Sequence, residues 1–133
     1  MSNEKNIIAP VDTEDETAVD AADTMVAEDE ENESLALYVH EFEKPFTWEG
    51  KTYDKLSFDF SKLRGKDVLA IMREIRMAGI TVASRTFDVE YQYRYAARCC
   101  EPRIGSDVIA ALPAKEFERI CTRVQRFLLR SAL

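Results

Sequence analysis

The hydrophobic pattern changes its period within one short stretch in the middle of the chain, and this change constrains the fold most. Apolar residues first alternate with polar ones at Leu56, Phe58 and Phe60, which is typical of a half-buried strand. From Val68 to Ile75 they recur instead along one face of a helix. A polar joint, Ser61 to Asp67, separates the two patterns. The stretch therefore predicts a strand that turns directly into a helix.

A second strand is expected just before this one. Residues 35–48 also alternate, and Pro45 within them suits an edge strand or a strand end. Glu49 and Gly50 form a plausible tight turn, because glycine accepts a positive φ. The two strands predict a β-hairpin, to which a third short strand can be added. A two-stranded ribbon is only marginally stable alone, so helices must cover its apolar face.

Helical patterns fill the rest of the chain. The predicted spans are 65–78, a second helix capped by Thr86 or Asp88 that runs to about residue 100, a short helix over 107–112 that Ser106 caps, and 114–130. The last span is the clearest, with one apolar face that consists of Phe117, Ile120, Cys121, Val124, Phe127 and Leu128. The predicted fold class is α+β, a β-hairpin packed on a bundle of three to four helices.

Charge divides the chain unevenly. Residues 1–34 contain Lys5 as their only base against twelve acidic residues, a net charge of −11. The whole chain carries −7, so residues 35–133 carry +4. The acidic segment has no aromatic residue and cannot bury enough surface to offset the entropy of ordering. We predict a disordered arm over 1–34, followed by a single domain over 35–133. The arm is either a solubilising tail or a tail that competes with an acidic partner or nucleic acid for the basic body.

Targeting signals and cysteine usage indicate the compartment. The N-terminus lacks a basic segment that leads into an apolar one, and no run approaches the roughly 20 apolar residues that span a bilayer. Three cysteines, two of them adjacent, make a poor disulfide framework. We expect a cytoplasmic protein with free, buried thiols and no membrane partner.

Residues with catalytic or metal-binding chemistry are few. His40 is the only histidine and lies in a predicted strand, where a packed or solvated role is commoner than catalysis. Cys99 and Cys100 are adjacent, whereas zinc sites space paired thiolates two to four residues apart. Four scattered glycines form no phosphate-binding loop. We expect no enzyme, no catalytic residue, no metal and no cofactor.

Candidate contact residues lie on the last two long helices. Tyr91 and Tyr95, with Arg94 and Arg98 beside them, are typical of a protein interface if they are exposed. The alternative is that this helix lies between neighbours and buries both sides. On the last helix, Arg123 and Arg126 are expected to supply the polar rim of the same contact surface. The stripe of arginines from 119 to 130 also raises nucleic-acid binding as an alternative, which the net negative charge opposes.

The order of these motifs resembles the tail assembly chaperones of long-tailed bacteriophages, over roughly residues 44–130. The matching motifs are Leu63, Gly65, Lys66 and Asp67 before the first helix, Leu112, Pro113, Ala114 and Phe117 at the start of the last, and Phe127, Leu128 and Leu129 near its end. Arg64, Cys99 and Cys100 depart from the pattern, and the acidic arm lies outside it.

This resemblance implies a role that is not catalytic. Such proteins bind the long, helical tape measure protein and keep it soluble while tail tube subunits assemble around it, and they are absent from the finished virion. By resemblance the partners are the tape measure protein first, then the tail tube protein and further copies of the chain. A small regulator that binds nucleic acid through the last helix remains the alternative function, and an acidic mimic of DNA ranks last.

Deletion of residues 1–34 is expected to leave the melting temperature nearly unchanged, because the predicted arm has no core to lose. The measurement is a thermal melt of the full and the shortened chain, followed by circular dichroism. A large drop in the melting temperature of the shortened chain would refute the prediction of disorder.

Overall fold

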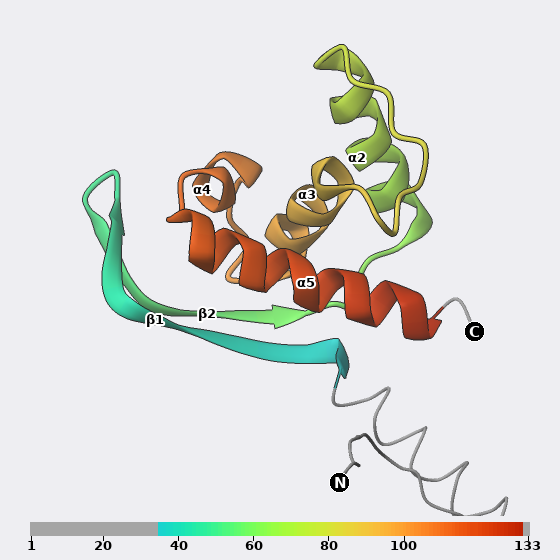
Figure 1. Ribbon diagram of the computed structural model, residues 1–133. Coiled ribbons are helices and arrows are strands. Elements are labelled where there is room, and N and C mark those ends of the chain that lie inside the picture. The colour runs from blue at the N-terminus through green and yellow to red at the C-terminus, as the bar shows by residue number, and fades with distance from the viewer. Residues whose placement is uncertain (1–34, 132–133) are drawn as a thin grey trace, which may run out of the picture. The chain divides into compact units, whose positions relative to one another are not determined.

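A computed structural model describes residues 35–131 of the chain, and these residues form a hairpin covered by helices (Figure 1). The strands are β1 (Leu37–Trp48), β2 (Lys51–Asp59) and the short β3 (Cys100–Glu101), in the sheet order β1-β2-β3. The helices are α2 (Gly65–Met77), α3 (Val89–Cys99), α4 (Ser106–Ala110) and α5 (Ala114–Ser131). The predicted α+β class is confirmed. The predicted arm, 1–34, lies outside the described residues.

The hairpin is antiparallel and closes at the predicted turn. Glu49 has φ 48° and Gly50 has φ 80°, the two positive values that match the right-handed twist of paired strands. Pairing is regular from Leu37↔Asp59 to Glu41↔Lys55 and again at the turn, but it shifts between Glu41 and Phe46. Pro45 lies within this bulge, where a missing amide hydrogen breaks no ladder bond.

Local capping explains where the helices begin and end. The Asp67 carboxylate accepts from the Arg64 amide at 2.9 Å at the start of α2, and the Asp88 carboxylate accepts from the Glu90 amide at 2.8 Å at the start of α3. Gly79, with φ 78°, follows the end of α2. The prediction that Ser106 caps α4 is wrong by one residue, because the helix begins at Ser106 and Gly105 precedes it as the cap.

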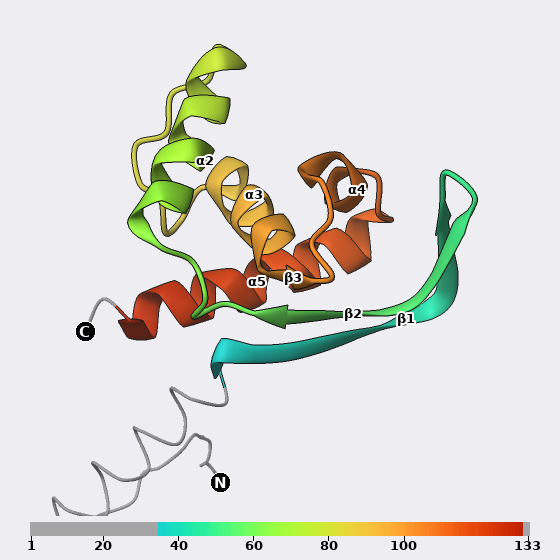
Figure 2. The ribbon, with the colours of Figure 1, turned by 180° about the vertical axis from the view of Figure 1, so that it is seen from behind.

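The core lies between one face of the sheet and the helices above it, as both ribbon views show (Figure 2). Phe60, just after β2, is fully buried, and its ring lies 5.6 Å from that of Phe58 and 5.9 Å from that of Phe127 on α5. The Tyr95 hydroxyl of α3 donates to the Phe60 carbonyl at 2.8 Å. The residue that follows β2 and precedes the polar joint thus lies in the centre of the core.

The last helix buries part of its predicted apolar face. Ile120, Cys121 and Val124 are buried, whereas Phe117, Phe127 and Leu128 are half-buried and pack against the core from its margin. The Phe117 ring lies 5.5 Å from the Tyr93 ring. The energetic centre of α5 is therefore Ile120 and Val124 rather than Phe117.

Replacing Ile120 by alanine is expected to lower the free energy of unfolding by about 2–5 kcal/mol, because the side chain is fully buried and its removal leaves a cavity. Phe117→Ala should cost less than the about 3–5 kcal/mol of a fully buried phenylalanine. Urea unfolding of both variants measures the difference. A larger loss for Phe117→Ala than for Ile120→Ala would contradict this ranking.

Candidate functional site

The two tyrosines predicted as exposed contact residues are buried. Tyr91 is 3% exposed and Tyr95 is 6% exposed. The reason is that α3 packs against α2, α4 and α5 and so buries both of its sides. The prediction that these two side chains are exposed is wrong, and the alternative of a helix between neighbours is the one observed.

The arginines of α3 are held by carboxylates. Arg94 is nearly buried and bonds the Glu90 carboxylate at 2.7 Å, with Glu74 of α2 at 3.4 Å. The Arg98 guanidinium forms a salt bridge of 2.8 Å with the Asp67 carboxylate at the start of α2. These contacts tie α3 to α2, so both arginines act within the fold rather than as a free rim.

The arginines predicted on α5 are more accessible. The Arg123 guanidinium lies 4.5 Å from the centroid of the Tyr38 ring on β1, a cation–π contact, and its side chain is half-buried. Arg126 is exposed. The structure therefore brings Arg123 together with β1, and not with the tyrosines of α3.

A surface cavity of about 320 Å³ opens where α2, α3 and the end of α5 meet. Its lining consists of Val68 from α2, Arg85 and Thr86 from the following loop, Tyr91 and Tyr95 from α3, and Leu128 and Ser131 from α5. The predicted tyrosines thus reappear as part of a cavity wall. No sequence signal distinguished the other lining residues, because they come from separate elements with ordinary helical patterns.

Few polar groups line this cavity. The Tyr95 hydroxyl already donates to the Phe60 carbonyl, and burial raises the pKa of Tyr95. Burial also raises the pKa of Tyr91, while the nearby Arg85 charge opposes that shift. Both phenols therefore stay neutral at physiological pH. The cavity offers apolar and aromatic walls with one cation, Arg85, which suits an apolar side chain next to an acidic group.

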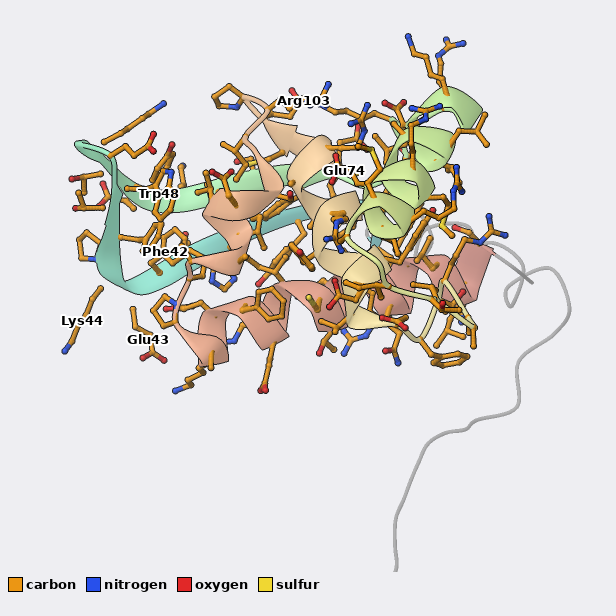
Figure 3. The ribbon with its side chains drawn as sticks, turned by 90° about the horizontal axis from the view of Figure 1, so that it is seen from above. Phe42, Glu43, Lys44, Trp48, Glu74 and Arg103 are labelled. Atoms are coloured by element: carbon orange, nitrogen blue, oxygen red, sulfur yellow. The ribbon has the colours of Figure 1, made fainter. Side chains whose placement is uncertain are left out.

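Two further cavities border the loop that follows β3. One, of about 390 Å³, lies between this loop and the tip of the hairpin, and its lining includes Trp48, Tyr53 and Arg103. The other, of about 360 Å³, includes Arg103 and Glu74 in its lining. Figure 3 shows Trp48 near the hairpin tip, Arg103 on the loop that follows β3, and Glu74 on α2. Both cavities expose more polar than apolar surface, and neither lining contains a cysteine or histidine.

The cysteines are packed thiols. All three are free and buried, as the sequence predicts. Burial raises the pKa of Cys100 to about 11 and that of Cys121 to about 12, and it raises the pKa of Cys99 as well. The reactive thiolate is therefore scarce at neutral pH. Residues 35–131 contain no cluster of histidine, cysteine, aspartate or glutamate that would hold a metal ion.

His40 takes part in a buried chain of hydrogen bonds that the sequence did not reveal. Its Nε2 lies 2.7 Å from Glu116 Oε1 of α5, and its Nδ1 lies 2.7 Å from the Tyr38 hydroxyl. Because the carboxylate can only accept, the pattern fits a neutral imidazole that donates from Nε2 and accepts from Tyr38. The Glu116 carboxylate also accepts from the Glu43 amide at 3.3 Å.

This series of hydrogen bonds resembles a catalytic relay in the order of its groups, but solvent hardly reaches it. The His40 side chain is fully buried, and Glu116 is only 6% exposed. A substrate has no route to the imidazole, so the bonds join β1 to α5 rather than activate a nucleophile.

Comparisons of the chain with protein-family models, with curated proteins and with solved structures found no match. Within residues 35–131, none of the helices combines the length and the apolar character needed to cross a bilayer.

The buried His40 predicts a pH-dependent stability. Burial lowers the pKa of His40 below its ordinary 6.5, although the hydrogen bond and the charge of Glu116 oppose the shift. The unfolded chain therefore takes up this proton at a higher pH than the folded chain does. The free energy of unfolding should be at its full value above pH 6.5 and decline as the pH falls toward the folded pKa.

Urea unfolding between about pH 7.5 and about pH 5.5 measures this decline, a range in which histidine is the side chain that normally titrates. His40→Gln is the matched control, because an amide keeps a donor near Glu116 but does not titrate. If the variant lost stability over this range as steeply as the parent, His40 would not be the group responsible.

Proposed function

We propose that this protein is a chaperone of bacteriophage tail assembly that acts by binding, without catalysis, in the host cytoplasm. Its partner is the helical tape measure protein, whose apolar face it covers until tail tube subunits assemble around it. The observation that carries the proposal is the cavity between α2, α3 and α5, which is lined by Val68, Leu128 and two tyrosines. The resemblance in motif order supplies the biological setting.

The cavity has the properties that a helical partner needs. An amphipathic helix presents apolar side chains at every third or fourth position, and grooves between helices receive them one at a time. A volume of about 320 Å³ accommodates such side chains. Next to lining residues in the sequence, Leu69 on α2 is 63% exposed and Leu129 on α5 is 40% exposed. Two of the helices that form the cavity thus also carry an exposed leucine outside its lining.

Nucleic-acid binding, the alternative function, gains no support from the contacts of α5. Arg123 packs on the Tyr38 ring, and Arg119 lies 3.9 Å from the Glu43 carboxylate. Two of the arginines that were predicted to contact phosphates therefore contact side chains of β1 instead. We therefore retain protein binding as the function.

Co-expression tests the proposal. The partner is the long helical protein encoded beside this chain, and the measurement is its soluble fraction after lysis and centrifugation. Wild-type chain should raise that fraction several-fold. Ser131→Trp, which places a large side chain at the edge of the cavity, should abolish most of the gain because it blocks the apolar pocket.

Thr122→Trp is the matched control, since it makes the same change at an exposed position of α5 that does not line the cavity. An unchanged soluble fraction with the wild-type chain would end the proposal. Equal gains with both tryptophan variants would show that the partner binds elsewhere on the chain.

A further inference from the structure

Half of the edge of β1 is open for pairing. In the described part of the chain β1 pairs with β2 alone, so its other edge carries no strand. The Ala36 carbonyl accepts from the Phe60 amide, and bonded pairs recur at every second residue of an antiparallel ladder. The backbone amides and carbonyls of Tyr38 and His40 therefore form hydrogen bonds with β2. The amides and carbonyls of Leu37, Val39 and Glu41 point to the open edge.

The other half of this edge is protected in three ways. The bulge between Glu41 and Phe46 bends the strand, Pro45 lies within it, and the Glu116 carboxylate accepts from the Glu43 amide. Figure 3 shows Glu43 and Lys44 on the outer side of β1, where charges discourage pairing. Folded proteins usually protect an edge strand along its whole length.

The bulge, Pro45 and the Glu116 carboxylate act beyond the segment from Leu37 to Glu41, in which Glu41 is the one acidic side chain. Leu37 is 64% exposed and Val39 is 53% exposed. Valine is among the residues that favour strands. The side chains of Leu37 and Val39 lie on the face of the sheet opposite to Tyr38 and His40. The open segment thus combines free backbone groups with exposed aliphatic side chains.

Arginines of α5 border the same segment. In the view from above, α5 lies on the β1 side of the sheet (Figure 3), and it runs antiparallel to β1, because Arg123 contacts Tyr38 while Glu116 contacts both His40 and Glu43. Arg119 and Arg126 lie one turn on either side of Arg123. The Arg123 guanidinium therefore places a positive charge on the inner face of the sheet at Tyr38, while Arg119 lies 3.9 Å from the Glu43 carboxylate.

We propose that the open edge of β1, Leu37 to Glu41, binds an extended acidic segment of a partner protein as an additional strand. Backbone groups of that segment pair with Leu37, Val39 and Glu41. Alternate side chains of an added strand point to opposite faces. Those on the inner face meet Arg119, Arg123 and Arg126 and are acidic, while those on the outer face lie beside Leu37 and Val39 and are aliphatic.

A second copy of this chain fits the edge less well. Antiparallel pairing of two β1 edges would place the arginines of one α5 opposite those of the other, and like charges at close range oppose association. Charge complementarity therefore selects an acidic strand. This surface is separate from the cavity at α2, α3 and α5, with which it shares no lining residue.

A labelled peptide of alternating valine and glutamate tests the proposal against the full chain. Fluorescence anisotropy should show binding that weakens as salt is raised. Amide exchange measured by nuclear magnetic resonance should be fast at Leu37, Val39 and Glu41 in the free chain and at least tenfold slower with the peptide, without change at Tyr38 and His40. Arg126→Glu should weaken binding at least tenfold.

Three controls sharpen the result. Arg76→Glu, at an exposed position of α2, and Ser131→Trp should both bind the peptide as the parent does. A peptide of alternating valine and lysine should not bind. The proposal is overturned if the lysine peptide binds equally, if the three amides do not respond to the glutamate peptide, or if they are already protected in the free chain, by a second copy or by another segment.

Discussion

The contact between β1 and α5 determines most of the arrangement. A hairpin does not hold its shape alone, and here the buried bond from His40 to Glu116 joins its first strand to the last helix. A buried carboxylate without a partner is costly, so this bond strongly favours one placement of α5 over the strand. The same helix then supplies Val124 to the core, Arg123 to the Tyr38 ring, and Leu128 to the cavity. One placement therefore sets the core and both candidate binding surfaces.

Local features of the fold were predictable from sequence because their causes are local. The period change around Leu63, the positive φ at Glu49 and Gly50, and the cap at Asp88 each depend on a few neighbouring residues. The buried bond between His40 and Glu116 joins residues 76 apart, and neither has a local signal. Of the two roles expected for His40 in a strand, packed or solvated, the structure shows the packed one. The strand pattern could not identify the carboxylate that keeps an imidazole in the core.

The candidate site was harder to predict for the same reason. An arginine beside a tyrosine has the same pattern on an exposed helix as on a helix between neighbours, and only the packing of α2 and α5 against α3 decides between them. Tyr91 and Tyr95 proved to be walls of a cavity, because burial leaves only small parts of their surfaces accessible. The other lining residues come from separate elements of the chain, and only the tertiary fold brings them together.

Net charge hides the local electrostatics that matter for binding. The chain carries −7, which argues against an acidic partner, yet the charge of residues 35–133 is +4, and their arginines gather partly along α5. Screening limits the reach of an exposed charge to about 10 Å at moderate salt, so a partner at the edge of β1 responds mainly to Arg119, Arg123 and Arg126. The edge of β1 has aliphatic side chains beside several arginines, whereas the cavity between α2, α3 and α5 has apolar walls and a single arginine. The two proposed surfaces therefore differ in the segments that we expect them to bind, one extended and acidic, the other helical and apolar.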